Sequence, residues 1–247
     1  MAAPVLDRHG NNVSSGGTTI TISISTGAVN TVVFVGCELG GTSATAKPAV
    51  SIAGAGLTWT AIDQTGAASA FSGGGIGSTV QLWWAIAATQ LTSQTVTVTS
   101  SQTIDDAAVV YASFTGAYAA APIDPNAGAI TASYHVGTSL TQTGVLSSTN
   151  ADNIAVFVAG DNGAPGTQPL TATSPAVFID IANNGGGSRW GWINIAYQAF
   201  SSAQTGVTVG FHQASGPTSG NGFVGGMLTA DAPSGGGAAQ VRALVIA

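Results

Sequence analysis

An internal repeat limits how this chain can fold. The apolar segment at residues 32–38, Val-Val-Phe-Val-Gly-Cys-Glu, has a counterpart at residues 155–161, Ala-Val-Phe-Val-Ala-Gly-Asp. Three shorter matches follow in the same order: 61–63 with 178–180, 91–98 with 200–209, and 110–115 with 224–229. The repeated units have the composition of β-strands and contain no catalytic motif. The repeat therefore favours a duplicated architecture and a non-enzymatic role.

Strand patterns account for most of each half. Residues 19–25 alternate Thr or Ser with Ile, so period-two geometry places the three isoleucines on one face. Residues 31–39 form a continuous apolar run, which is typical of a strand buried on both faces. Similar segments recur with Gly, Ser, Thr and Pro between them, which predicts an all-β, antiparallel β-sandwich or jelly-roll architecture with an internal duplication. The other predicted strands are 49–53, 57–63, 79–87, 95–99, 107–115, 138–146, 153–159, 176–182, 189–200, 206–211 and 222–230.

Composition shifts divide the chain into five parts. These are an N-terminal arm (1–17), a first sandwich half (18–121), a linker (122–137), a second half (138–233), and a glycine link with a C-terminal strand (234–247). The sequence leaves open whether the halves form two tandem sandwiches or share one core. The C-terminal strand contains Val241, Leu244 and Ile246. It either folds back onto a sheet edge or is donated to a neighbouring subunit, because an open apolar edge invites association.

The composition excludes several functions. Only 6% of the residues are charged, against about 25% in ordinary soluble domains. Four Lys and Arg against ten acidic residues leave no basic patch for nucleic acid. No apolar run reaches the roughly 18 residues of a membrane span, and residues 1–7 lack the features of a signal peptide. We expect a protein made in a reducing cytosol, with the single Cys37 as a small buried hydrophobe.

Residues for catalysis or metal binding are scattered. The three histidines do not stand near a nucleophile or a carboxylate in a recognised pattern, and no His/Cys/acid cluster has metal-ligand spacing. Paired carboxylates for glycoside hydrolysis are the strongest enzyme hypothesis, with Glu38 and Asp63 or Asp161 and Asp180 as the pairs. Their matched positions in the repeat favour a structural role at strand ends instead. We therefore predict no catalytic residues, no metal and no cofactor.

The tryptophans allow two interpretations. Trp83 and Trp84 are adjacent and point to opposite faces of a strand, whereas Trp190 and Trp192 share a face. We favour a role in the sandwich core. If exposed, they would stack on sugar rings or anchor a protein interface.

The order of the strand motifs resembles that of a known group. It runs from the Thr/Ile strand through Val-Val-Phe-Val-Gly, Gly-Leu-Thr-Trp-Thr, Gln-Leu-Trp-Trp and Thr-Val-Thr-Val-Thr to Ala-Val-Val-Tyr-Ala-Ser-Phe-Thr-Gly. This series, from about residue 18 to 231, resembles the β-sandwich structural proteins of tailed-bacteriophage virions, in head decoration and tail positions. The resemblance implies a virion structural protein without catalytic residues, and it leaves head and tail positions open.

Three functional hypotheses follow. The first is a phage head decoration (cement) protein that forms homo-oligomers and contacts other capsid or tail proteins. The second is a carbohydrate- or receptor-binding module of a tail fibre or cell-surface adhesin, with Trp83 or Trp84 and Trp190 or Trp192 as stacking platforms. The third is a glycan-cleaving enzyme that uses one of the carboxylate pairs.

Overall fold

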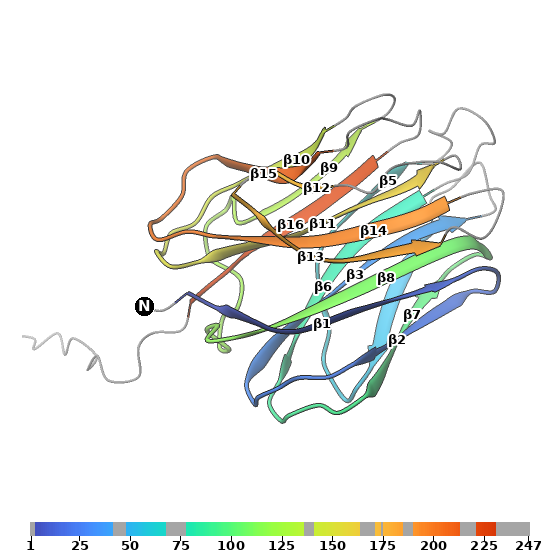
Figure 1. Ribbon diagram of the computed structural model, residues 1–247, viewed down its shortest axis with the longest axis horizontal. Helices are drawn as coiled ribbons and strands as arrows, with labels where there is room; N and C mark the ends of the chain where they lie inside the picture. The colour runs from blue at the N-terminus through green and yellow to red at the C-terminus, as the bar shows by residue number, and fades with distance from the viewer. Residues whose placement is uncertain are drawn as a thin grey trace, which may run out of the picture.

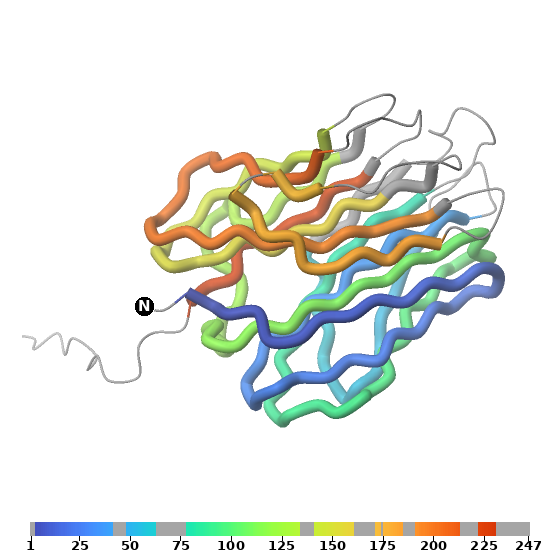
Figure 2. The backbone as a smooth tube through the Cα atoms, viewed as in Figure 1, coloured from blue at the N-terminus to red at the C-terminus, as the bar shows by residue number. Residues whose placement is uncertain are grey.

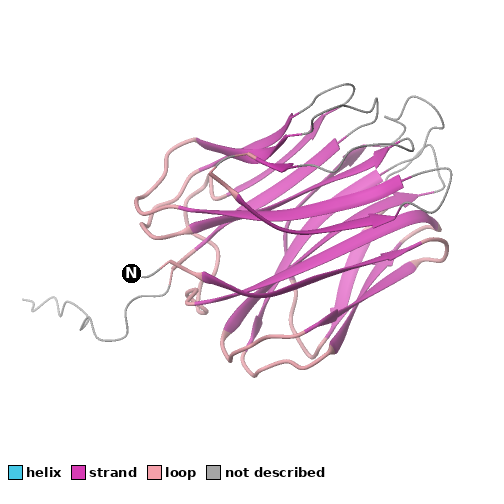
Figure 3. Ribbon diagram, viewed as in Figure 1, coloured by secondary structure: helices cyan, strands magenta, loops and turns pink. Residues whose placement is uncertain are grey.

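The described part of the chain is built from antiparallel β-strands. The computed structural model describes residues 3–41, 48–67, 78–135, 141–163, 171–173, 175–184, 190–212 and 221–230. Within these ranges every regular element is a strand, and every strand pair is antiparallel (Figure 3). The predicted all-β, antiparallel fold class is confirmed. No helix among the described residues is long and apolar enough to cross a membrane.

The first half forms two sheets. Its strands are β1 (Val5–Ser14), β2 (Thr19–Ile24), β3 (Thr31–Gly41), β4 (Val50–Gly54), β5 (Thr60–Ala67), β6 (Ser78–Ala87), β7 (Gln94–Ser100) and β8 (Ile104–Thr115). The first large sheet has the order β1-β8-β3-β6-β5, and the first small sheet has the order β2-β7-β4 (Figure 1).

The second half has the same plan. Its strands are β9 (Ile130–His135), β10 (Thr141–Leu146), β11 (Ile154–Gly163), β12 (Thr171–Ala172), β13 (Val177–Asn184), β14 (Trp190–Ala199), β15 (Val207–His212) and β16 (Asn221–Leu228). The second large sheet has the order β9-β16-β11-β14-β13, and the second small sheet has the order β10-β15-β12. Each strand therefore occupies the place of the strand numbered eight lower in the first half.

The four sheets stack as layers, with the two large sheets face to face in the middle (Figures 1 and 2). Across this interface β1 meets β13 and β5 meets β9, while β8 meets β14 and β6 meets β16. β3 and β11, which hold the same place in the two halves, also meet each other. These are the pairs that a twofold axis running along β3 and β11 would produce.

Three apolar cores lie between the four layers. The central core joins the large sheets and draws on both halves, with Val32, Phe34, Val110, Phe114, Val156, Val158, Ile193 and Leu228 among its members. The first outer core fills the first half, with Ile20, Ile22, Val33, Val35, Trp83, Val96, Val98 and Val109. The second outer core fills the second half, with Leu146, Phe157, Trp192, Ala196, Phe211, Phe223 and Met227. β3 is buried along its whole length because it has a core on each face, as its continuous apolar run predicted.

Two segments that the sequence analysis placed in the N-terminal arm and the linker form strands in the structure. Residues 5–14 of the predicted arm form β1, which pairs with β8 at the edge of the first large sheet. Residues 130–135 of the predicted linker form β9, which pairs with β16 in the corresponding place. Both are outermost strands whose described side chains are all exposed or half-buried, so neither has the apolar alternation by which other strands were predicted. Residues 231–247, including the predicted C-terminal strand, lie outside the described residues.

The strongest match in the sequence repeat is displaced by one residue in the structure. Val110 and Val224, which are matched in sequence, pair with Gly36 and Val158 respectively. Gly36 and Val158 are thus structurally equivalent, which makes Val156 the counterpart of Phe34. The sequence match instead aligns Phe34 with Phe157, one residue further along. Phe34 lies in the central core and Phe157 in the second outer core, because a shift of one residue turns a side chain to the other face.

Candidate functional site

The tryptophan side chains proposed as stacking platforms are largely enclosed. Trp83 is 3% exposed and packs in the first outer core, and Trp192 is 1% exposed and packs in the second. Trp84 is half-buried against the central core. The side chain of Trp190 lies outside the described residues. Trp83 and Trp192 therefore offer no face to a sugar ring, as the core interpretation predicted.

The carboxylates considered for hydrolysis lie in different surroundings. Glu38 is fully buried and its Oε1 accepts a hydrogen bond from Ser78 Oγ at 3.0 Å. Asp180 lies at the edge strand β13 and is bonded to residues of β1. The side chains of Asp63 and Asp161 lie outside the described residues. Glu38 and Asp161 also do not share a position in the repeat, because the ladder makes Gly160 the counterpart of Glu38.

Glu38 belongs to a polar region of the interface between the large sheets. Its Cβ lies 2.9 Å from the position that a Cβ on Gly160 would take, and the Asp106 carboxylate packs beside it against Gly191. Ser78 and Gly191 are themselves equivalent, since they pair with Gly40 and Asn162. Polar side chains of the first half thus occupy space that glycines of the second half leave open.

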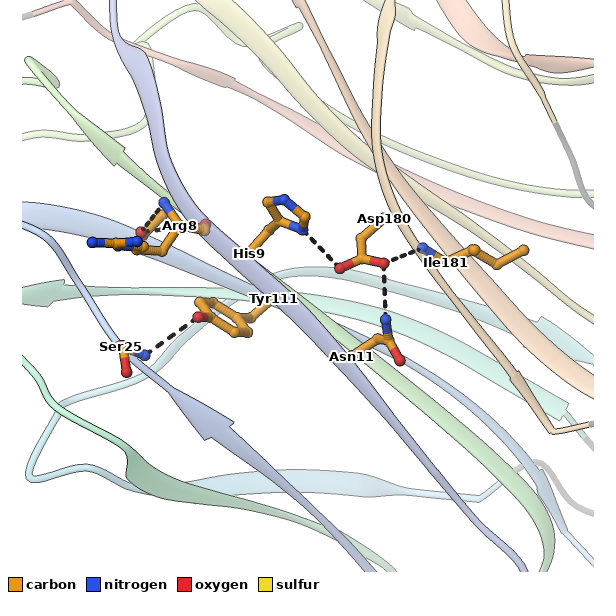
Figure 4. Close-up of polar contacts among 8 residues, drawn as sticks. Arg8, His9, Asn11, Ser25, Tyr111, Asp180 and Ile181 are labelled. Atoms are coloured by element: carbon orange, nitrogen blue, oxygen red, sulfur yellow. Dashed lines mark hydrogen bonds and ion pairs between the residues drawn. The ribbon is translucent and has the colours of Figure 1, made fainter.

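A polar contact joins the outer strands β1 and β13 (Figure 4). His9 Nδ1 lies 2.8 Å from Asp180 Oδ2, and Asn11 Nδ2 donates to Asp180 Oδ1 at 2.8 Å. The same Oδ1 accepts from the backbone N–H of Ile181. Below this group the Tyr111 hydroxyl accepts from the backbone N–H of Ser25 at 3.4 Å. The contact closes one side of the interface between the halves.

Asp124 organises the connection between the halves. It is 3% exposed, and its carboxylate accepts backbone N–H groups of Asn126 and Thr149, each at 2.9 Å. It also accepts the backbone and side-chain N–H groups of Asn150 and the side-chain amide of Asn153 at 2.7 Å. Burial by itself raises the pKa of Asp124, but the hydrogen bonds outweigh burial and hold the pKa below its ordinary value.

Exposed apolar side chains gather on the outermost strands. Eight large hydrophobic side chains of the described residues are exposed, and six of them lie on β1, β9, β10 or β13, each of which ends its sheet. These six are Val5, Val13, Ile130, Val145, Val177 and Phe178. Val177 and Phe178 are neighbours on β13, which has a register shift between Phe178 and Asp180. We call the six residues the edge-strand apolar set.

The outer face of the first small sheet is uncharged and rich in hydroxyl groups. Thr19, Thr21 and Ser23 of β2 pair with Thr99, Thr97 and Thr95 of β7, and all six point away from the first outer core. The strict alternation of residues 19–25 predicted this face.

Sequence patterns did not identify the edge-strand apolar set or the role of Asp124. Val177 and Phe178 fell within a predicted strand, but no pattern showed that this strand ends its sheet. Within the described ranges no group of three or more His, Cys, Asp or Glu side chains is placed to hold a metal ion.

Comparison with known proteins gave no relatives for the chain. No family model, curated protein or solved structure matches it.

Proposed function

We propose that this protein is a non-enzymatic structural component of a virus particle, made in the host cytoplasm, that decorates the head. Its partners are copies of itself and neighbouring capsid or tail proteins. The observation that carries the proposal is the edge-strand apolar set. Outermost strands have unpaired N–H and C=O groups, and apolar side chains beside these groups favour association with another chain.

The topology of each half supports this proposal. We infer that each half is a jelly roll. In the first half β1, β8, β3 and β6 are neighbours in one sheet, and β2, β7 and β4 are neighbours in the other. The arrangement differs from a jelly roll in one strand, because β5 pairs with β6 in the large sheet instead of with β4 in the small sheet. The second half repeats the arrangement, which supports a duplicated jelly roll. Viral capsid proteins and lectins both use jelly rolls, so the topology alone does not choose between them.

The surface composition favours assembly. Charged residues are 6% of the chain, so few like-charge contacts oppose close packing of many copies. The central core joins both halves by apolar packing, which suits a rigid building block. Contacts through β13 at one side and β10 at another would allow one subunit to meet more than one neighbour.

The carbohydrate-binding alternative has less support. Sugar stacking needs exposed aromatic rings, and Trp83 and Trp192 are enclosed in the outer cores. The exposed aromatic side chains of the described residues are Tyr118 and Phe178, which are on opposite halves of the chain. We therefore propose no glycan site on these residues.

The oligomeric state of the full chain tests the proposal. Multi-angle light scattering over a range of concentrations should show an oligomer for the wild type. A Val177→Lys, Phe178→Lys variant should shift it towards monomer, because charge on an edge strand opposes association. Thr99→Lys, on the uncharged outer face of β7, is the control and should leave the oligomer intact. A wild type that stays monomeric at every concentration would contradict the proposal.

The position in the particle needs a separate measurement. Immunogold electron microscopy of purified particles with antibodies to this chain should label heads. Labelling of tails alone would retain the structural role and overturn the head assignment. Absence of the chain from particles, judged by mass spectrometry, would overturn the virion assignment.

A further inference from the structure

Two buried side chains of β14 carry polar atoms without a hydrogen-bond partner among the described residues. Asn194 is fully buried, and neither its Oδ1 nor its Nδ2 has a hydrogen-bond partner among the residues that the structure describes. The same holds for Nε1 of Trp192, which is 1% exposed. Residues two apart on a strand share a face and lie about 7 Å apart. Both side chains therefore point into the space between the second large and second small sheets.

The first half carries a related group at the equivalent position. Asn194 pairs with Ala159 across the ladder, and Gln81 pairs with Cys37. Ala159 and Cys37 are equivalent, as the neighbouring pair Gly36 and Val158 shows, so Gln81 corresponds to Asn194. Gln81 is also buried, and its Oε1 has no hydrogen-bond partner within the described ranges. Each sandwich thus has a buried carboxamide with an unused acceptor at the same place.

These unpaired groups are costly in an apolar interior. More than about 90% of buried polar groups in native proteins have a partner. An unpaired buried group loses the hydrogen bonds to water that it makes in the unfolded chain and gains none in return. Asn194 faces the second outer core beside Trp192, Ala159 and Phe223. The buried Gln142 of β10 faces the same core from the small sheet. Such a concentration of unpaired atoms indicates a partner that is not part of the protein.

The donors and acceptors define the chemistry of that partner. It must accept from Trp192 Nε1–H and Asn194 Nδ2–H and donate to Asn194 Oδ1. A hydroxyl group does both, whereas a simple anion cannot donate and a metal cation cannot accept. The buried acidic side chains of the described residues are Glu38, Asp106 and Asp124. The first two face the central interface and the third is bonded near residues 126 and 149–153, so this site is neutral.

We propose that the second sandwich encloses a small neutral guest that presents hydroxyl groups to Trp192 and Asn194. Water and a small polyol share this chemistry. The guest goes beyond the assembly role, because its contacts lie inside the sandwich and not at the edge strands. It stabilises the interior by pairing with the amide and indole groups.

Substitution of Asn194 gives opposite results with and without a guest. Asn194→Leu keeps the branched shape of the side chain and removes the amide. If a guest pairs with the amide, the midpoint of urea unfolding should fall, since the guest loses its partners. If the amide is unpaired, the midpoint should stay the same or rise, since replacing an unpaired buried polar group by an apolar one is neutral or stabilising. The second result would overturn the proposal.

A gentler variant covers the case in which Asn194→Leu fails to fold. Trp192→Phe removes only the indole N–H and part of the ring. Its midpoint change is compared with that of Asn194→Ala and with that of the double variant. A shared guest makes the changes non-additive, because the first substitution already releases or weakens it. Additive changes would contradict the proposal.

A direct experiment distinguishes the two sources of the guest. The wild type is crystallised without any polyol, and native mass spectrometry is run on the same protein. Compact density within hydrogen-bond distance of Trp192 Nε1 and Asn194, with no excess mass, identifies water. Extended density with an excess mass that Asn194→Leu abolishes identifies a polyol. No density at either group would overturn the proposal, and none of these results depends on oligomer formation.

Discussion

Glu38 packs directly against Gly160, its own counterpart in the other half of the chain. The Cβ of Glu38 is 2.9 Å, and its Cγ 3.0 Å, from the position that a Cβ on Gly160 would take. Equivalent residues meet in this way because β3 and β11 face each other at the middle of the interface. One member of the pair must be small if the other is long, and the absence of a side chain at Gly160 makes room for Glu38.

Gly160→Ala should destabilise the protein by about 1–3 kcal/mol, the usual cost of overpacking a well-filled interior. The added methyl group meets Glu38 and Val80 of the opposite sheet. Urea unfolding followed by fluorescence measures the change. Ser51→Ala, on an exposed position of β4, is the control and should alter stability by less than about 0.5 kcal/mol. Equal effects of the two substitutions would show that the interface is loosely packed.

Asp124→Asn should destabilise the protein at pH 7 by about 1–3 kcal/mol, because the carboxylate accepts five N–H groups that an amide oxygen pairs with less well. The folded-state pKa of Asp124 is lowered by these bonds. The stability that it contributes is therefore present above the unfolded pKa of about 3.9. That stability is lost as the pH falls through the lower folded pKa.

Urea unfolding of the wild type and Asp124→Asn between pH 7 and pH 2 checks this pH dependence. The difference in unfolding free energy should be constant down to about pH 5 and then shrink. Asp105→Asn, at an exposed carboxylate of the first half, controls for the loss of one negative charge. A difference that is independent of pH would contradict the assignment to the Asp124 carboxylate.

Cys37 should be unreactive in the folded protein. Burial raises the pKa of its thiol well above the ordinary value, and the neighbouring Glu38 carboxylate raises it further. The thiolate is the reactive form, so a disulfide reagent at pH 8 should modify the native chain very slowly and the urea-unfolded chain at once. Rapid modification without urea would show that the interior around β3 opens readily.

Asp180→Ala should lower the unfolding free energy more than His9→Ala does. The His9–Asp180 pair is worth only about 0–1 kcal/mol, because His9 is 47% exposed. Asp180 also accepts from Asn11 and from the backbone N–H of Ile181, and those donors lose their partner when the carboxylate is removed. Thermal unfolding of the two variants and the double variant measures the coupling. A larger effect from His9→Ala would contradict this order.

The sequence predicted the all-β architecture and most strands. A strand buried on one face needs apolar residues at every second position, and a strand buried on both faces needs a continuous apolar run. It did not predict β1, β9 or the two-residue β12, whose exposed edge positions place no such demand on composition. The shared central core was not predicted. The apolar run of residues 31–39 indicates burial on both faces, but it does not indicate which sheet packs against the second face. The Phe34 and Phe157 match shows the same limit, because identical letters can face opposite cores.

The candidate site was less predictable than the fold. The core interpretation of Trp83 and Trp192 agrees with their burial. The edge-strand apolar set depends on the order of strands in each sheet, and single-sequence patterns do not contain that order. The network at Asp124 joins residues from two loops that are distant in sequence. The unpaired amide of Asn194 is recognised only from the side chains that surround it in the folded structure.

The shared direction of β3 and β11 gives the whole molecule a polarity. Glu38 follows Gly36 along β3 as Gly160 follows Val158 along β11, and these residues meet in that order. Odd-numbered strands of both halves therefore finish at one end of the block, and even-numbered strands finish at the other. A paired block of this kind has a top and a bottom, unlike one whose halves run in opposite directions. Insertions in the loops at one end can change the exposed surface there, while the loops at the opposite end keep a constant contact surface.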